Sequence, residues 1–140
     1  MQPIIAKSAG GLKVRIDTDS HVIVSDEPVD QGGAGEGPNP YDLLLASLGS
    51  CTVMTILMYA RRKEWDVGEI TVALTHESIH AQDCEDCEST QGKVTRIHRE
   101  VGFTGDLTDE QRERLLEIAG HCPVSRALTR EIMIVDSLAK

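Results

Sequence analysis

Apolar and polar residues alternate near the start of the chain with the period of a β-strand. The alternation runs from Leu12 to Ile16, the next four residues, 17-DTDS-20, are turn formers, and residues 22–24 are all apolar. Two short apolar segments on either side of a polar turn indicate two antiparallel strands. The sequence therefore predicts a β-hairpin here.

A breaker-rich loop and a long helix follow. The segment 31-QGGAGEGPNP-40 holds four glycines and two prolines, which are unsuited to a regular element, and we interpret it as a flexible loop. Asn39 can cap a helix whose first residue is Pro40. We expect this helix to run from about Pro40 to Lys63, where basic residues suit its negative end.

Residues 43–60 of this predicted helix carry no charged side chain. Eighteen uncharged residues approach the length of a membrane span. The serines, threonines and glycine among them make the segment too polar for one, so we expect a buried central helix instead. A helix of 24 residues is about 36 Å long, more than the strands of this chain can cover. We therefore predict a homodimer.

The second half of the chain predicts two more strands and two helices. Residues from Ile70 to Ile79 and from Val94 to Phe103 alternate as strands, and the polar segment 81-AQDCEDCESTQG-92 connects them in a long hairpin. Thr108 and Gln111 form a capping box for a helix that ends near Gly120. The remaining predictions are a short helix with Cys122 at its cap and Pro123 at its first position, and a last strand, Ile132–Val135.

This order of elements is typical of an α+β protein, and we find no linker, so residues 1–140 are expected to form one domain. Lysine and arginine total 14 against 23 acidic residues, which gives a charge of −9 and disfavours nucleic acid and anionic membranes as partners. The N-terminus lacks the pattern of a secretory signal, so we expect a cytoplasmic protein. In that reducing setting, catalytic, metal-binding or buried cysteines are expected rather than permanent disulfides.

Two of the four cysteines are candidates for catalysis. Cys51 lies on a predicted helical stripe with Leu44, Leu48, Thr55 and Met58, and Cys122 begins a helix, where unpaired N–H groups favour a thiolate. Either cysteine alone is also consistent with an ordinary buried residue. Spacing alone leaves both interpretations open.

The other two cysteines lie in 80-HAQDCEDCE-88. His80, Cys84 and Cys87 could bind zinc with a fourth ligand such as His76 or His98. Four acidic residues flank the pair and oppose free thiolates. A solvated loop with spare thiols, a metal site and a redox role all remain open.

Two segments of this chain resemble the osmotically inducible protein C (OsmC) and organic hydroperoxide resistance (Ohr) family. They are 39-NPYDLLLASLGSCTVM-54 and 121-HCPVSRAL-128, in this order, and their cysteines are 71 residues apart. The similarity extends over nearly the whole chain. It implies an OsmC-like α+β fold, with antiparallel sheets wrapped around long central helices in an intertwined homodimer and active sites at the subunit interface.

The resemblance also implies a reaction. Cys51 matches the peroxidatic cysteine, which attacks an organic hydroperoxide and becomes a sulfenic acid, and Cys122 matches the resolving cysteine. A dithiol such as a lipoyl protein or thioredoxin would reduce the resulting disulfide, and no cofactor is needed. The alternatives are a non-enzymatic OsmC-like protein that binds an apolar small molecule, and a metal-binding protein that uses the C-x2-C loop.

The chain departs from the family around the reactive cysteine. In the family a glutamate ten positions earlier holds an arginine that stabilises the thiolate, and here that position is Tyr41, with Asp42 beside it. Arg15 is the nearest guanidinium in sequence to the expected arginine. His121, next to Cys122, is a further candidate for proton transfer. We therefore treat these four residues as supporting candidates.

Overall fold

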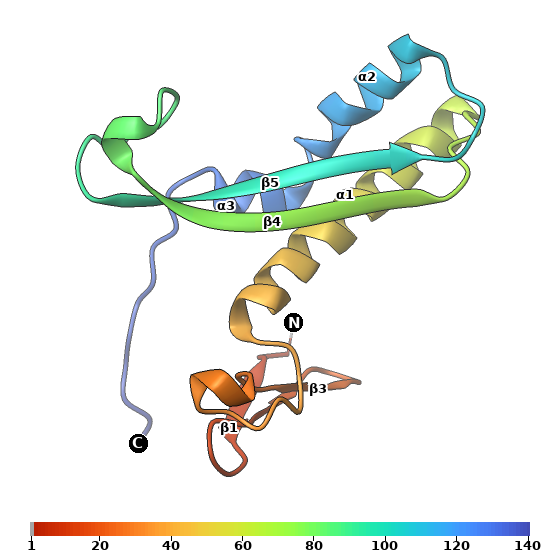
Figure 1. Cartoon of the computed structure of the whole chain (residues 1–140). Helices are drawn as coiled ribbons and strands as arrows, with labels where there is room; N and C mark the ends of the chain where they lie inside the picture. Colours follow the sequence, from red (N-terminus) through yellow and green to blue (C-terminus); the bar gives the residue numbers. More distant parts are fainter. Residues whose placement is uncertain (1) are drawn as a thin grey trace. The chain divides into compact units, whose positions relative to one another are not determined.

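The computed structural model describes residues 2–140 as an α+β protein with antiparallel sheets (Figure 1). The chain forms two compact units, one up to Ala46 and one from Ser47 to Lys140, and each is described by itself below. Helix α1, Pro40–Lys63, begins in the first unit and continues in the second.

The first unit contains a three-stranded antiparallel sheet in the order β1-β2-β3. Its strands are β1, Ile5–Ser8; β2, Val14–Asp17; and β3, Val22–Ser25. Val14 pairs with Ser25 and Ile16 with Ile23, which confirms the predicted hairpin. Strand β1 was not predicted, because four residues are too few to show a clear alternation.

The glycine-rich loop is ordered around one buried carboxylate, so its interpretation as flexible was wrong. Asp26, 3% exposed, accepts hydrogen bonds from the backbone N–H groups of Glu27 at 2.8 Å and of Ala34 and Glu36 at 3.2 Å. A Cβ atom on Gly33 would lie 1.9 Å from the Glu27 carbonyl oxygen, so only glycine fits there. A 3-10 turn, η1, Val29–Gln31, lies within this loop.

The same contacts control the ionisation of Asp26. Burial tends to raise the pKa of this carboxyl, but the backbone hydrogen bonds, together with the positive charge of Lys13, outweigh burial and lower it. The ionised carboxylate is therefore the form that the loop binds.

Helix α1 begins and ends where the sequence predicts. The Asn39 side chain accepts a hydrogen bond from the Asp42 N–H at 2.8 Å, and the Asp42 carboxylate accepts one from the Asn39 N–H at 3.1 Å. Both donors belong to the helix N-terminus, where backbone N–H groups otherwise lack partners.

The second unit is built on the long hairpin of β4, Ile70–His80, and β5, Lys93–Phe103. The two strands pair without interruption from Ile70↔Phe103 to His80↔Lys93, and a 3-10 turn, η2, Ala81–Asp83, lies in their connection. Helices α2, Asp109–Ala119, and α3, Pro123–Leu128, follow. The capping box of Thr108 and Gln111 is present, as predicted.

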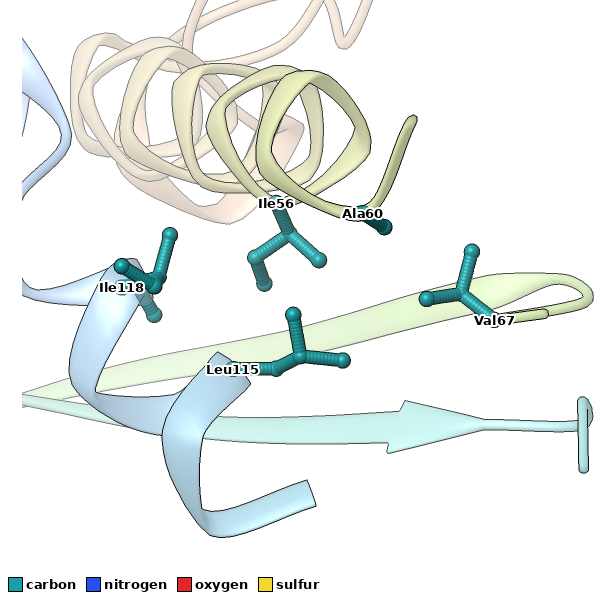
Figure 2. Packing of buried hydrophobic residues seen from close by; sticks show 6 residues of the cluster. Ile56, Ala60, Val67, Leu115 and Ile118 are labelled. Atoms are coloured by element: carbon teal, nitrogen blue, oxygen red, sulfur yellow. The ribbon is translucent and has the colours of Figure 1, made fainter. Parts of the chain in front are cut away.

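The core of the second unit lies between helices α1 and α2 and the hairpin. Figure 2 shows Ile56 of α1 and Leu115 and Ile118 of α2 pointing toward one another. The buried stripe of α1 is different from the predicted one. Its members follow one another at intervals of four residues: Leu48, Thr52, Ile56 and Ala60.

This stripe leaves part of the predicted apolar face exposed. Met58 was expected on the buried stripe but is 60% exposed, and Met54 is 61% exposed. The pattern along a helix that is apolar on all sides does not specify which face is covered, because every face satisfies it. By length and composition α1 could also cross a membrane, but this is weak evidence, since the core helix of a soluble protein passes the same test.

The predicted strand Ile132–Val135 was wrong. These residues form no regular element, and their side chains are 57% to 83% exposed. A strand needs a hydrogen-bonding partner, and among residues 2–140 no strand pairs with this segment.

Replacing Leu115 tests the core. Leu115 is completely buried, so Leu115→Ala should lower the free energy of unfolding by about 2–5 kcal/mol. Its neighbour Leu116 is 55% exposed, and Leu116→Ala should change stability by no more than about 0.5 kcal/mol. Chemical denaturation measures both. Equal losses in the two variants would contradict the described packing.

Replacing Asp26 tests the loop. Because folding lowers the pKa of Asp26, its stabilising effect is present above the unfolded pKa of about 3.9 and is lost as pH falls through the folded value. Asp26→Asn should therefore lower Tm at pH 7, and the difference from the unaltered chain should shrink below about pH 4. The exposed Asp30 supplies a control, Asp30→Asn. A difference in Tm that is independent of pH would contradict this account.

Candidate active site

The fold brings together two cysteines that are 71 residues apart. Cys51 lies on α1, and Cys122 is the N-cap of α3, with extended backbone angles and Pro123 at the first helical position. The Cys51 side chain lies close enough to Cys122 to favour negative charge on its sulfur, so the two side chains are neighbours. Both are free thiols; Cys122 is completely buried and Cys51 is partly exposed. A small reagent can therefore reach Cys51 more easily than Cys122.

Two groups besides Cys51 contact the sulfur of Cys122. The backbone N–H of Ser125 donates a hydrogen bond to it at 3.3 Å, and the hydroxyl oxygen of Thr52 lies 3.9 Å away. Thr52 is itself completely buried, and its hydroxyl donates to the Leu48 carbonyl oxygen at 2.7 Å. Cys122 therefore lies among groups that can donate hydrogen bonds.

A guanidinium completes the arrangement. Nη1 of Arg99, on β5, donates a hydrogen bond to the Thr52 hydroxyl oxygen at 3.0 Å. Thr52 thus bridges the positive charge of Arg99 and the sulfur of Cys122.

These contacts set the pKa of Cys122. Burial tends to raise the pKa of this thiol, but the hydrogen bonds from Ser125, Cys51 and Thr52 and the charge of Arg99 outweigh burial and lower it. A hydrogen bond that stabilises a thiolate makes the sulfur a better nucleophile near neutral pH. The pair therefore contains one sulfur, that of Cys122, whose thiolate form is favoured.

Sequence reasoning missed Arg99 and Thr52. Arg99 lies on the less exposed face of β5, in the series Ile97, Arg99, Val101, where its neighbours on that face are apolar. An arginine in the middle of an apolar face is unusual, because its charge needs a partner when it is partly buried. This was the available signal, and it indicates a polar partner on another element.

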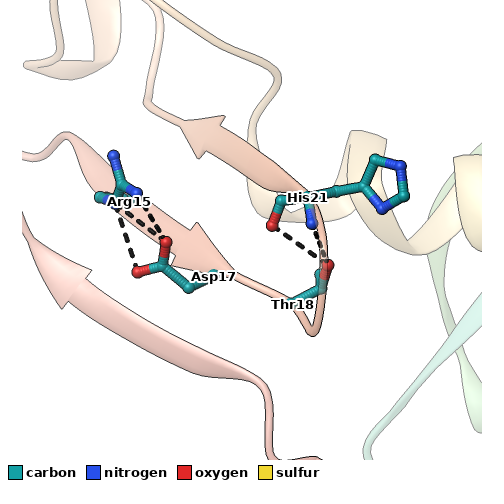
Figure 3. A network of polar contacts seen from close by, with 4 residues as sticks. All are labelled: Arg15, Asp17, Thr18 and His21. Atoms are coloured by element: carbon teal, nitrogen blue, oxygen red, sulfur yellow. Dashed lines mark hydrogen bonds and ion pairs between the residues drawn. The ribbon is translucent and has the colours of Figure 1, made fainter.

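The supporting candidates taken from the family resemblance have other contacts. Arg15 forms an ion pair with Asp17 at 2.8 Å on the same face of β2, beside the turn closed by Thr18 and His21 (Figure 3). The Asp42 carboxylate caps α1, as described above. Tyr41 is 49% exposed at the start of the same helix. All three belong to the first unit.

His121 is exposed at the junction of α2 and α3. It lines a cavity of about 570 Å³, which is mainly apolar and lies over the second half of α1 and the end of α2. The other residues that line this cavity are Thr55, Met58, Tyr59, Arg61, Arg62 and Ile118.

Cys84 and Cys87 form a disulfide, so the expectation that permanent disulfides are disfavoured was wrong for this pair. Of the interpretations left open for the loop, neither spare thiols nor thiolate ligands for a metal at His80, Cys84 and Cys87 fit the bonded sulfurs. A turn at Glu85 and Asp86 separates the two cysteines, whose Cα atoms lie 5.5 Å apart, within the usual range for a disulfide. Sulfurs bonded to each other are not thiolate ligands. Among residues 2–140, no group of three or more His, Cys, Asp or Glu side chains is arranged to hold a metal ion.

Comparisons with known structures support the fold. A protein from Psychrobacter arcticus, provisionally named an osmotic stress induced and detoxification response protein, is 26% identical, with a TM-score of 0.72 over 90% of this chain and 87% of that one. An organic hydroperoxide resistance protein OsmC from Legionella pneumophila is 20% identical, with a TM-score of 0.66 over 92% and 90%.

A third structure, from Vibrio cholerae, is provisionally named an organic hydroperoxide resistance protein and holds captopril in one of its active sites. It is 22% identical, with a TM-score of 0.65 over 92% of this chain and 85% of that one. No curated protein sequence matches the chain. The family model described as OsmC-like protein matches residues 33–135, most of the chain. The chain therefore belongs to the OsmC-like protein family.

Proposed function

We propose that this protein is a thiol peroxidase that reduces organic hydroperoxides through Cys51 and Cys122. The observation that carries the proposal is the pair of neighbouring free cysteines, one partly exposed and one buried among groups that stabilise a thiolate. Membership of a family with relatives named for hydroperoxide resistance supports the choice of substrate.

The different exposure of the two sulfurs supports the roles we propose for them. Cys51, as a thiolate, attacks one oxygen of the O–O bond; the alcohol leaves after taking a proton, and Cys51 becomes a sulfenic acid. Cys122, as a thiolate, then attacks the Cys51 sulfur and releases water after protonation, which forms a disulfide. An external dithiol, such as a lipoyl protein or thioredoxin, restores both thiols.

Arg99 supplies the positive charge that an arginine elsewhere in the chain supplies in the family. It is a positioning residue, because it acts on Cys122 through the Thr52 hydroxyl. Rotation of the Thr52 hydroxyl would turn its proton from the Leu48 carbonyl to the Cys122 sulfur while Arg99 remains bound to the oxygen. The charge of Arg99 thereby favours negative charge on the Cys122 sulfur.

We also propose that the protein is a homodimer. Met54 and Met58 on α1 and the apolar residues of the C-terminal segment are largely exposed in the single chain. A second subunit would cover such surfaces at a favourable free energy of about 25 cal/mol per Å² of apolar area. Light scattering should give twice the mass of one chain.

A second candidate function is the non-enzymatic binding of an apolar small molecule. The cavity of about 570 Å³ lined by Met58, Tyr59 and Ile118 favours it, because this volume is typical of ligand sites. A binding protein would show no hydroperoxide turnover, so the assay below separates the two functions.

Replacing the cysteines tests the reaction. With cumene hydroperoxide and dithiothreitol, Cys51→Ser should abolish turnover to the background rate. Cys122→Ser should still convert Cys51 to a sulfenic acid, which dimedone labelling and mass spectrometry detect. An unaltered chain without turnover would refute the peroxidase proposal, and full activity in Cys51→Ser would refute the assignment of the reactive sulfur.

Replacing Arg99 and Thr52 tests the thiolate. Loss of either residue should raise the pKa of Cys122, the nucleophile of the second step, so the pH profile of disulfide formation after a single turnover should move to higher pH. The rate of disulfide formation at neutral pH should fall about tenfold for each pH unit by which the profile moves. Arg99→Met and Thr52→Val should both show this displacement, and Arg99→Lys should restore part of the activity.

Thr55→Val is the matched control, since Thr55 lies one turn further along α1 and lines the apolar cavity instead. Its profile should stay unchanged. Profiles of Arg99→Met and Thr52→Val that keep their position on the pH axis and differ only in height would contradict the assigned role.

A further inference from the structure

The two cysteine pairs of the second unit are in different redox states. Cys84 and Cys87 are joined in a disulfide, whereas Cys51 and Cys122 are free thiols. The charges around each pair predict which of the two pairs has the lower reduction potential.

The surroundings of Cys84 and Cys87 are negative. Four acidic residues lie between Ala81 and Gly92, and this connection contains no lysine or arginine. Cys87 also lines a groove of about 970 Å³ whose charged members are Asp86, Glu88 and Glu131 against the single cation Arg130. Negative charges destabilise thiolates, and a reduced pair that is destabilised has a lower potential. The dithiol form of this pair is therefore a good reductant.

The surroundings of Cys122 have the opposite effect. The Ser125 N–H, the Thr52 hydroxyl and the Arg99 guanidinium all stabilise negative charge on this sulfur, and His121 on the preceding junction is exposed toward another cavity. Stabilising the reduced form raises the reduction potential of the Cys51–Cys122 pair. Electrons should thus pass from the acidic loop to this pair.

Two grooves share residues at the end of helix α3, which begins after its N-cap, Cys122. The groove at Cys87 is lined by Leu128 and Thr129. The same two residues line a second groove, of about 500 Å³, together with Arg99 and with Ser125, whose N–H donates to the Cys122 sulfur. The acidic loop and the residues that surround Cys122 therefore border adjoining grooves.

We propose that Cys84 and Cys87 are a second redox centre, which reduces the Cys51–Cys122 disulfide after each turnover. The inference rests on the proposed peroxidase function and adds the immediate reductant. It requires the β4–β5 connection to move along the grooves, because thiol–disulfide exchange needs direct contact between sulfurs.

The exchange balances in two steps. The Cys87 thiolate attacks the partly exposed Cys51 sulfur, and Cys122 leaves because its thiolate is the better stabilised of the two. The Cys84 thiolate then attacks Cys87 and releases Cys51. Two electrons and two protons pass from the loop to the catalytic pair, and an external dithiol finally reduces the Cys84–Cys87 disulfide.

Counting equivalents of hydroperoxide tests the relay. The chain is fully reduced, freed of reductant and treated with excess cumene hydroperoxide in a rapid assay of alcohol formation. With the relay, each chain should consume two equivalents, since the first disulfide moves to the loop and frees the catalytic pair for a second turnover. The variant Cys84→Ser/Cys87→Ser should consume one equivalent, which also shows that it is folded.

The outcomes separate the two proposals. Consumption of one equivalent by the unaltered chain overturns the relay and leaves the peroxidase intact, whereas no rapid consumption overturns the peroxidase itself. Cys51→Ser should consume none, and two equivalents in this variant would mean that the loop reacts with hydroperoxide directly. The rate of the second equivalent should be independent of protein concentration, and a proportional rate would overturn transfer within one chain.

A measurement of the two potentials is independent of hydroperoxide. Equilibration in dithiol buffers, followed by alkylation and mass spectrometry, should give a lower midpoint for Cys84–Cys87 than for Cys51–Cys122, by at least tenfold in the equilibrium constant, or about 30 mV. Neutralising the loop in Glu85→Gln/Asp86→Asn should narrow the gap, and the reverse order of midpoints would overturn the proposal.

Discussion

The packing of one face of α1 against α2 and the start of α3 determines the rest of the candidate site. Ile56 meets Leu115 and Ile118 in the core, and one turn earlier on the same stripe Thr52 lies beside Cys122. Burial of these side chains provides the driving force for the contact. The cysteine pair is therefore placed by the hydrophobic core, which keeps the two sulfurs together without a covalent bond.

The candidate site also shows how a thiolate can be favoured inside an apolar core. Burial alone would keep Cys122 protonated, so the environment has to supply compensating hydrogen bonds and charge. Ser125, Thr52 and Arg99 come from α3, α1 and β5, so the contacts that favour the thiolate form require three elements to be in place. Stabilisation of the thiolate is thus coupled to folding.

The arginine near the cysteine pair, Arg99 on β5, comes from a part of the chain where none was expected. Its charge acts through a hydroxyl group, so the guanidinium stays at the partly buried face of β5 while its effect extends to a completely buried sulfur. This arrangement agrees with the chain's departures from the family pattern. Tyr41 stands where the family has a glutamate, Asp42 is engaged in a helix cap, and Arg15 is paired with Asp17.

The sequence by itself determined the features that depend on neighbours along the chain. The bounds of α1, the cap at Asn39, the hairpins, the capping box at Thr108 and the N-cap position of Cys122 follow from local hydrogen bonding and periodicity, and all were predicted. The family resemblance added the pairing of Cys51 with Cys122. Local patterns suffice here because helices and hairpins satisfy their backbone groups within a few residues.

Only the tertiary structure decided which face of α1 is buried, which cation serves Cys122, and that Cys84 bonds to Cys87. A helix that is apolar on all sides offers many faces for packing, so its buried stripe depends on the partner elements. Arg99 and Thr52 are 47 residues apart, and nothing local links them. The C-terminal segment was mistaken for a strand because its composition suits one, but a strand exists only where another chain segment completes its hydrogen bonds.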